Sequence, residues 1–176
     1  AAAALNTVPV TLELGGKSPQ IVFADADLDA ALPFLVNAGI QNAGQTCSAA
    51  SRLLVERRVF DEVVARLAQR YRTLRAGPAL ADLELGPLIS KRQHQIVSRY
   101  LGLAQDSGLA IAAQGEIVAD APAGGFYVRP TLVAAVPDDH ALAQEEIFGP
   151  VQVVIPFDGE ADAVCIANGT PYGLVA

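Results

Sequence analysis

The sequence predicts an α/β fold in three layers, with helices on both faces of a mainly parallel sheet. Short runs rich in Val, Ile and Leu alternate along the chain with amphipathic segments of helical length, and Gly or Pro punctuates the junctions. Strands that alternate with helices favour parallel pairing, because each crossover between parallel strands needs a connection long enough to hold a helix. The elements follow one another without a repeat or a linker, which predicts one domain over residues 1–176.

The expected strands are apolar, or alternate apolar with small and polar residues, and cover residues 8–14, 20–23, 52–56, 110–113, 131–136 and 151–156. The expected helices carry apolar residues at helical spacing or begin at a capping residue, and cover residues 28–43, 59–74, 90–105, 141–146 and 160–167. Ser90 with Gln93 resembles a capping box. Gly44 ends the first helix, so Cys47 is expected on the loop just beyond it.

Composition excludes several kinds of partner. The formal charge is -7 and the sequence pI is about 4.7, whereas nucleic acids and anionic membranes select basic surfaces. No apolar run approaches the roughly 20 residues of a membrane helix, and the first residues lack the basic and apolar parts of a secretory signal. Cys47 and Cys165 lie in unlike contexts and predict no disulfide, which fits a reducing compartment, so we expect a cytoplasmic protein.

Two features of the termini predict a piece of a longer protein. The sequence contains no Met, and its last residues, Tyr172 to Ala176, read as a turn that leads into a further apolar segment. We therefore expect the domain to be incomplete at both ends.

Two chemically distinctive residues lie on glycine-bearing loops. Glu13 begins the segment Glu13-Leu14-Gly15-Gly16-Lys17-Ser18-Pro19, and Cys47 ends the segment Gly44-Gln45-Thr46-Cys47. A thiolate can attack a carbonyl carbon, and a carboxylate can then activate the water that releases the acyl group. The pair therefore predicts covalent catalysis followed by hydrolysis.

Each of these residues needs help from its surroundings. Leu12 and Leu14 flank Glu13, so we expect its carboxylate at a buried strand end, where desolvation strengthens a general base. No basic residue adjoins Cys47 in sequence, so loop N–H groups or the start of a following short helix would have to favour its thiolate. Cys165 lies in an expected helix and is predicted to be a core residue.

Three segments together resemble the catalytic domain of the aldehyde dehydrogenase superfamily. They are the Glu13 segment, the Cys47 segment and Glu145-Glu146-Ile147-Phe148-Gly149-Pro150, and their order and spacing are also similar to those of the family. Two further stretches, Gly125 to Leu132 and Asn168 to Leu174, add to the likeness. The resemblance covers nearly the whole chain.

The resemblance implies a fold, a reaction and a cofactor. Cys47 would attack an aldehyde to give a thiohemiacetal, hydride would pass to NAD or NADP, and Glu13 would be the base that hydrolyses the resulting thioester. In the family, the second Glu of the third segment bonds the nicotinamide ribose and the Phe packs near the ring. The residues implied to lie beside the cofactor are Glu146, Phe148, Leu14 and Gly15.

The resemblance also implies what this piece lacks. The family places a dinucleotide-binding domain, and an Asn that helps to hold the oxyanion, before the segment seen here, and further segments after it. Loss of one oxyanion donor typically lowers the rate about 10²-fold or more. We therefore expect this piece alone to be inactive or nearly so, and the complete protein to be a homo-oligomer.

Other readings of the same residues stay open. In a CoA-acylating relative, CoA rather than water takes the acyl group, but such relatives commonly lack a base like Glu13. A cysteine hydrolase would need an imidazole near Cys47, which only His94 or His140 could supply. A catalytically silent binding or assembly module is a third reading, because the nucleotide domain is not in this chain.

No metal and no phosphate loop are expected. His94 and His140 are expected at the surface and lack the paired spacing of a metal site. The string Gly15 to Ser18 lacks the first glycine and the spacer of a phosphate-binding loop. Lys17 is therefore expected to be structural or exposed.

Overall fold

A five-stranded sheet forms the middle layer of the protein, which the computed structural model describes over residues 2–175. The strands lie side by side in the order β1 (Pro19–Val22), β2 (Arg52–Glu56), β7 (Val151–Phe157), β6 (Thr131–Ala134) and β4 (Ala110–Gln114). Neighbouring strands pair in parallel, except that β4 runs antiparallel to β6. The mainly parallel sheet predicted from the sequence is therefore confirmed.

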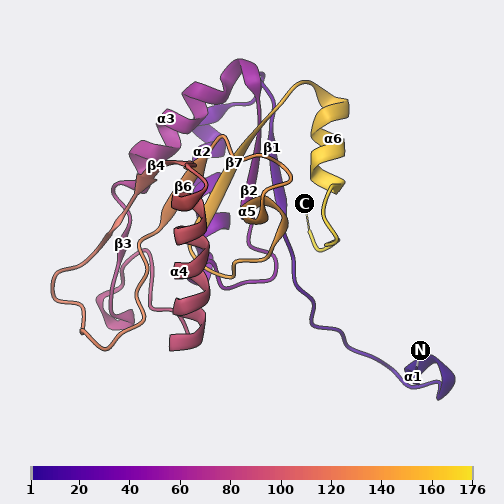
Figure 1. Cartoon of the computed structure of the whole chain (residues 1–176), viewed down its shortest axis with the longest axis horizontal. Helices are drawn as coiled ribbons and strands as arrows, with labels where there is room; N and C mark the ends of the chain where they lie inside the picture. Colours follow the sequence, from indigo (N-terminus) through magenta and orange to yellow (C-terminus); the bar gives the residue numbers. More distant parts are fainter. Residues whose placement is uncertain (1, 176) are drawn as a thin grey trace.

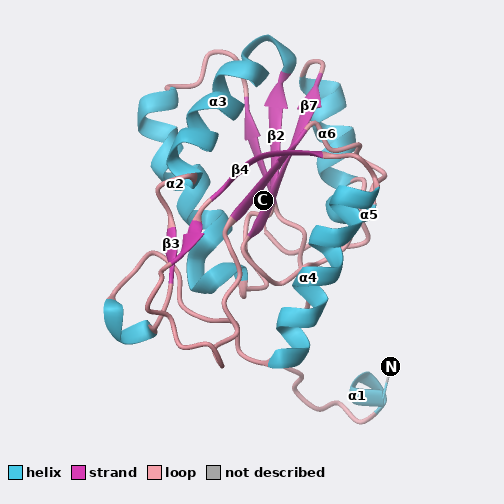
Figure 2. Ribbon diagram, turned by 60° about the vertical axis from the view of Figure 1, so that its left-hand side comes forward, coloured by secondary structure: helices cyan, strands magenta, loops and turns pink. Residues whose placement is uncertain are grey.

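Helices cover both faces of this sheet, as Figure 2 shows. One face carries α2 (Leu28–Ile40) and α3 (Phe60–Tyr71), and the other carries α4 (Lys91–Asp106), α5 (Ala141–Gln144) and α6 (Glu160–Asn168). The smaller elements are α1 (Ala2–Leu5), the paired strands β3 (Arg75–Ala76) and β5 (Glu116–Ile117), and the 3-10 turns η1 (Gln41–Gly44), η2 (Arg57–Val59) and η3 (Ala79–Ala81). The three-layer architecture is confirmed.

Local sequence explains where the helices begin. The Asp27 side chain accepts hydrogen bonds from the backbone N–H groups of Asp29 and Ala30, and so caps α2. The Ser90 hydroxyl accepts from the Gln93 N–H at the start of α4. Only this half of the predicted capping box forms, because the Gln93 side chain is engaged elsewhere.

The sheet is buried on both faces, which is why its strands read as continuous apolar runs. The side chains of β2 and β7 that fill the core include Leu53, Leu54, Val153 and Val154, none of which is exposed to solvent. Phe23 follows the last residue of β1, and Phe157 is the last residue of β7. Their rings meet edge to face with the centroids 5.1 Å apart.

One polar side chain lies within this apolar layer. Gln152, on β7, is fully buried, accepts a hydrogen bond from the Tyr71 hydroxyl at 3.0 Å, and donates to the carbonyl oxygens of Leu35 and Ala50 at 3.0 and 2.8 Å. Burial raises the pKa of Tyr71, which keeps this hydroxyl a proton donor. Gln152 therefore fastens α2 and α3 to the sheet and fixes the chain just before β2.

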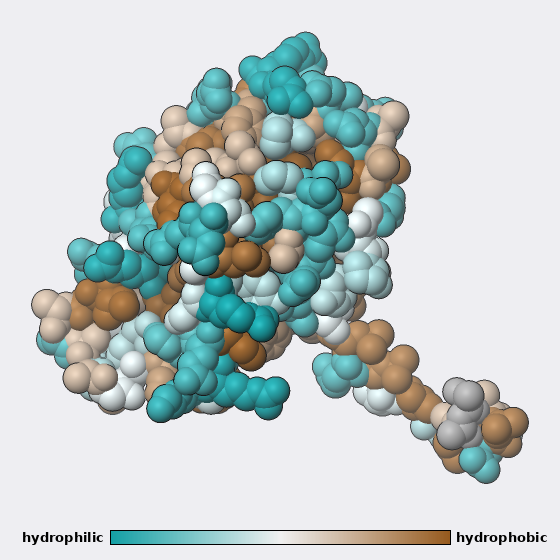
Figure 3. All heavy atoms as spheres, viewed as in Figure 1, coloured by the Kyte–Doolittle hydropathy of each residue, from teal (hydrophilic) through white to brown (hydrophobic). Residues whose placement is uncertain are grey.

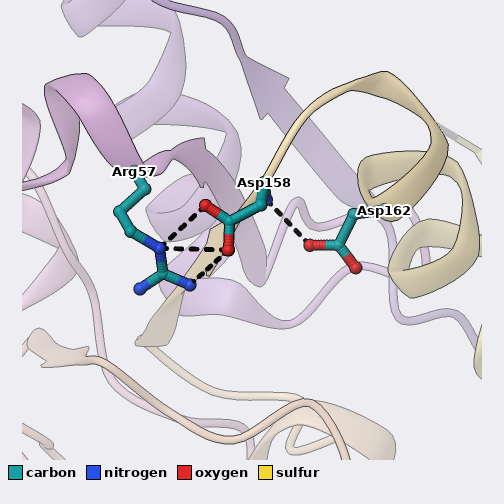
Figure 4. Close-up of polar contacts among 3 residues, drawn as sticks. All are labelled: Arg57, Asp158 and Asp162. Atoms are coloured by element: carbon teal, nitrogen blue, oxygen red, sulfur yellow. Dashed lines mark hydrogen bonds and ion pairs between the residues drawn. The ribbon is translucent and has the colours of Figure 1, made fainter.

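An exposed ion pair joins the ends of β2 and β7, as Figure 4 shows. The Arg57 guanidinium donates to both carboxylate oxygens of Asp158, at 2.9 and 2.8 Å, and holds the pKa of that carboxyl below its usual range. Asp162 accepts from the Asp158 N–H at 2.8 Å at the start of α6. Water and salt screen these groups, so they orient the turn more than they stabilise the fold.

Residues 8–14 do not form the predicted strand. They run as an extended arm from the body of the protein towards α1 (Figures 1 and 3), and the arm side chains Val8, Val10, Leu12 and Leu14 are all exposed. A strand needs a neighbouring backbone to bond its N–H and C=O groups. None of the strands within residues 2–175 pairs with this arm, so the alternating pattern has no partner here.

Cys165 is exposed, so the prediction that it is a core residue is wrong; α6 turns Ala163 and Ile166 inward and leaves the cysteine outside. Within the part of the chain that the structure describes, no helix has the length and the hydropathy of a membrane-crossing segment.

The role of Gln152 leads to a test. Gln152→Leu keeps the side-chain size but leaves the Tyr71 hydroxyl and two buried carbonyl groups without partners, so the free energy of unfolding should fall by about 3 kcal/mol. Denaturant titration gives the value, with Gln95→Leu on the exposed face of α4 as control. Equal losses in the two variants would contradict the assignment.

Candidate active site

One open cavity of about 580 Å³ gathers all six candidate site residues that were predicted from the sequence. Its lining residues come from three separate stretches of chain and are Glu13, Leu14, Gly15, Gln45, Thr46, Cys47, Ser48, Glu146 and Phe148. The two candidate catalytic residues and the four candidate cofactor residues therefore share one space. The volume lies in the range of small-molecule sites.

Cys47 lies on a turn between η1 and β2. The Ala49 N–H donates to the Thr46 carbonyl oxygen at 3.0 Å, and the thiol-bearing residue is half-buried. The chain then runs into β2 without an intervening helix, which removes one of the two sources considered for favouring the thiolate. Any help for the thiolate from backbone dipoles must come from loop N–H groups.

The loop before Cys47 is held in an unusual conformation. Asn42 and Ala43 have left-handed φ angles of 51° and 53°, and Gly44 follows with φ +72°. Asn42 and Gln45 exchange hydrogen bonds, each side chain donating to the other's carbonyl oxygen at 3.0 Å. The Gln45 side-chain oxygen also accepts from the Ile89 N–H at 2.9 Å. This polar clamp fixes the backbone that presents the thiol.

Glycines let the other two loops approach this one closely. A Cβ at position 16 would overlap the carbonyl oxygen of Cys47, and a Cβ at position 44 would overlap that of Gly149. A Cβ at Gly15 would come within 2.5 Å of Glu146 Oε2. The closest neighbours of these glycines are therefore the thiol loop, the Gly149 carbonyl group and the Glu146 carboxylate.

The loop that carries Glu146 and Phe148 is fixed from two sides. The Gly16 N–H donates to Glu146 Oε1 at 3.1 Å, and Gln93 Nε2 donates to the carbonyl oxygens of Ile147 and Phe148 at 3.0 and 2.8 Å. Phe148 has φ +55°, a conformation that a bulky residue adopts only when its surroundings hold it. The Gln93 amide supplies that restraint.

The adjacent residues Glu145 and Glu146 make different contacts. Tyr100 donates a 2.5 Å hydrogen bond from its hydroxyl to Glu145 Oε2, whereas Glu146 lines the cavity. Burial, and next the bond to the Glu145 carboxylate, raise the pKa of Tyr100. Glu145 therefore anchors the loop to α4, and only the second carboxylate is free to face a ligand.

Glu13 reaches the cavity from the end of the arm. It is exposed, so the prediction that it lies at a buried strand end is wrong. The reason is the unpaired arm, because burial of residue 13 needed a strand beside it. Its place in the cavity rests on the turn into Gly15 and Gly16, which packs against the Cys47 loop.

Three glutamines matter more to this site than the sequence indicates. Gln45, Gln93 and Gln152 fix the backbone on each side of the cavity. No role was predicted for Gln45 or Gln152, and Gln93 was predicted only as part of a capping box. A signal was present for two of them. Gln152 is the one polar residue in the apolar run 151–157, and Gln93 stands where a capping box places its return bond.

The histidines do not reach Cys47. Neither His94 nor His140 lines the cavity; His140 is half-buried and caps α5 by accepting from the Leu142 N–H at 3.1 Å. The imidazole that a cysteine hydrolase needs is therefore missing from the cavity within residues 2–175. Over the same residues, no group of three His, Cys, Asp or Glu side chains is placed to hold a metal ion.

The chain is similar in sequence to known aldehyde dehydrogenases. A family model described as "Aldehyde dehydrogenase family" matches residues 1–176. The betaine aldehyde dehydrogenase of Mesorhizobium japonicum is 41% identical over 168 residues, which are 94% of this chain and 34% of that protein. The putative aldehyde dehydrogenase DhaS of Bacillus subtilis is 41% identical over 175 residues, 99% of this chain and 35% of that protein. The chain thus spans about a third of the length of these relatives.

The chain is also similar to solved structures of aldehyde dehydrogenases. A putative aldehyde dehydrogenase from Burkholderia cenocepacia superposes with a TM-score of 0.94 at 61% identity, over 97% of this chain and 36% of that one. The NAD+ complex of an aldehyde dehydrogenase from Bacillus cereus gives a TM-score of 0.87 at 40% identity, over 97% of this chain and 34% of that one. The resemblance read from three loop motifs is confirmed, and the chain belongs to the aldehyde dehydrogenase family.

Proposed function

We propose that this chain carries the catalytic thiol and the deacylating base of an enzyme that oxidises an aldehyde to a carboxylic acid. The observation that carries the proposal is the shared cavity. Cys47 and Glu13 come from separate loops, yet both line it, and Glu146 and Phe148 form part of the same wall. Aldehyde dehydrogenases among the relatives support this class of reaction.

Cys47 is the proposed nucleophile. Its thiolate adds to the carbonyl carbon, a C–S bond forms, and the carbonyl electrons move onto oxygen. The backbone N–H of Cys47 makes no hydrogen bond to any group within residues 2–175, so it is available to donate to this oxyanion. The glycine contact at position 16 holds the Cys47 peptide in place while charge develops.

Glu13 is the proposed base for the second half of the reaction. Once an acyl group is on Cys47, the carboxylate takes a proton from a water molecule as the water oxygen attacks the thioester carbon. The C–S bond then breaks, which restores the thiolate and releases the acid. Because Glu13 is exposed, water reaches it directly from solvent.

The opposite wall fits the nicotinamide end of NAD or NADP. Glu146 Oε1 accepts from Gly16 N–H, and the missing Cβ at Gly15 leaves room beside Oε2, so the carboxylate can also accept from ribose hydroxyls. Phe148 offers an aromatic face, and Leu14 an apolar contact, in the same cavity. When bound, the nicotinamide supplies the hydride acceptor of the oxidation. The NAD+ complex of the Bacillus cereus relative favours NAD.

The rest of the nucleotide site is proposed to lie outside this chain. The chain spans about a third of its relatives and is proposed to be part of their catalytic domain, without the domain that binds the dinucleotide. Aldehyde oxidation by residues 1–176 alone should then be absent or nearly so. Assembly of the complete protein as a homo-oligomer stays a prediction.

Acyl transfer tests the proposal without any cofactor. A 4-nitrophenyl acetate ester lets Cys47 form the same kind of thioester with no hydride step. In a Cys165→Ser background, mass spectrometry should find one acetyl group on Cys47, and Cys47→Ala should remove it. Glu13→Gln should slow its hydrolysis about 10²-fold, so that the acetyl-enzyme accumulates.

The control for this experiment is Glu116→Gln, which neutralises an exposed carboxylate on β5. It should hydrolyse the acetyl group at the unmodified rate. Failure of Cys47 to acetylate would sink the proposal. Hydrolysis that is indifferent to Glu13→Gln, but rapid transfer to added CoA, would point to the CoA-acylating reaction instead.

The close approach of the loops gives a second test. Gly16→Ala adds a Cβ into the Cys47 carbonyl oxygen and must displace the thiol loop, so acetylation of Cys47 should fall at least about tenfold. Gly86→Ala, where nothing lies within 4 Å of the added Cβ, should acetylate normally. Equal rates in both variants would show that the contact does not position the thiol.

A further inference from the structure

A second pocket lies behind the loop that joins Glu13 to β1. It has a volume of about 300 Å³ and shares no lining residue with the candidate active site. Its polar and charged walls are Lys17, Arg52, Asn168 and Thr170, and Tyr172 lies beside them. Among residues 2–175, two cationic side chains and no acidic one line the pocket.

Lys17 places a buried ammonium group in the wall of this pocket. Its side chain is 1% exposed, and its Nζ makes no hydrogen bond within residues 2–175. The alternative that Lys17 is exposed is therefore wrong. A buried ammonium group carries three donors and a full charge, and native proteins almost always pair such a group.

Arg52 is itself positively charged and does not neutralise the Lys17 ammonium group. Its guanidinium donates to the carbonyl oxygens of Lys17, Ile166 and Ala167 at 2.8, 2.9 and 2.8 Å, and it forms no ion pair with a carboxylate of the described residues. Two of its five N–H groups are left for another acceptor. Arg52 thus caps the last turn of α6 and adds a second positive charge to the pocket wall.

The nearest carboxylates act on Lys17 only from a distance. Burial is the main cause that lowers the pKa of Lys17 from 10.5 to about 7, and Arg52 lowers it further. Glu146 and then Glu145 oppose this effect, but neither bonds the ammonium group. Glu146 is held by Gly16 and Glu145 by Tyr100.

We propose that this pocket is a binding site for a carboxylate group, which Lys17 holds as its direct partner and Arg52 supports. A carboxylate is favoured over a phosphate because the last carbonyl groups of α6 meet Arg52 at the pocket wall, and this negative end of the helix disfavours a dianion. A single negative charge matches the single ammonium group in the pocket wall. The carboxylate has two possible sources, a free small acid or an acidic side chain.

Lys17 can be observed selectively by NMR, because Lys17 and Lys91 are the two lysines of the chain. Selective ¹³C labelling of lysine gives two NMR signals, and Lys91, which is exposed at the start of α4, is the internal reference. Saturating sodium acetate, against sodium chloride at equal ionic strength, should raise the titration midpoint of Lys17 by about one pH unit or more. The Lys91 midpoint should not move.

The results with acetate, chloride, phosphate and a blocked glutamate decide whether the proposal holds. No acetate-dependent shift at Lys17, or an equal shift with chloride, would overturn the proposal. An equal shift with inorganic phosphate would overturn the preference for a carboxylate. A glutamate blocked at its amino and α-carboxyl groups separates the sources: tighter binding than acetate supports an acidic side chain as the occupant, and weaker binding supports a free acid. Failure of Cys47 to acetylate would leave these outcomes unaffected.

The unpaired charge also predicts a pH dependence. Between pH 7 and 10.5 the unfolded chain holds a proton on Lys17 that the folded chain has released, so the stability of the unmodified protein should rise relative to Lys17→Met across this window. Below pH 7 the variant should have the higher denaturation midpoint, and acetate should narrow the gap. A gap that is independent of pH and of acetate would contradict a buried, unpartnered ammonium. Lys91→Met is the control.

Discussion

The candidate site depends on backbone contact between three loops that only glycine permits. Gly16 lies against the Cys47 carbonyl, Gly44 lies against the Gly149 carbonyl, and Gly15 faces the Glu146 carboxylate. A side chain added at any of these positions would have to displace its neighbour, so the thiol loop, the Glu13 loop and the Glu146 loop constrain one another's positions. Main-chain contacts of this kind give a site the positional accuracy that covalent catalysis requires.

Three amide side chains hold this arrangement to the sheet. Gln152 ties the chain just before β2 to β7, Gln45 ties the thiol loop to residue 89, and Gln93 ties the Phe148 loop to α4. An amide suits these positions because it carries donors and an acceptor but no charge, so its burial costs little once its bonds are made. Lys17 is the contrast, because its buried ammonium group has no hydrogen-bond partner within residues 2–175.

Much of the fold followed from the sequence, and the exceptions have physical causes. The strand at residues 52–56 and the cap at Ser90 were predictable because periodicity and capping are local properties. The arm at residues 8–14 was not, since a strand exists only beside a partner, and none lies within residues 2–175. Glu13 was wrongly expected to be buried for the same reason. Burial of Lys17 and exposure of Cys165 depend on tertiary packing that no short pattern encodes.

The central claim is that residues 13 and 47 face one reacting carbon. A short bifunctional thiol reagent tests this most directly in a Glu13→Cys, Cys165→Ser variant, with Val8→Cys, Cys165→Ser as its partner on the same arm. The shared cavity predicts an intramolecular cross-link between position 13 and Cys47 in the first variant and none in the second. No cross-link from position 13, or equal cross-linking from position 8, would contradict a common site for the thiol and the acid.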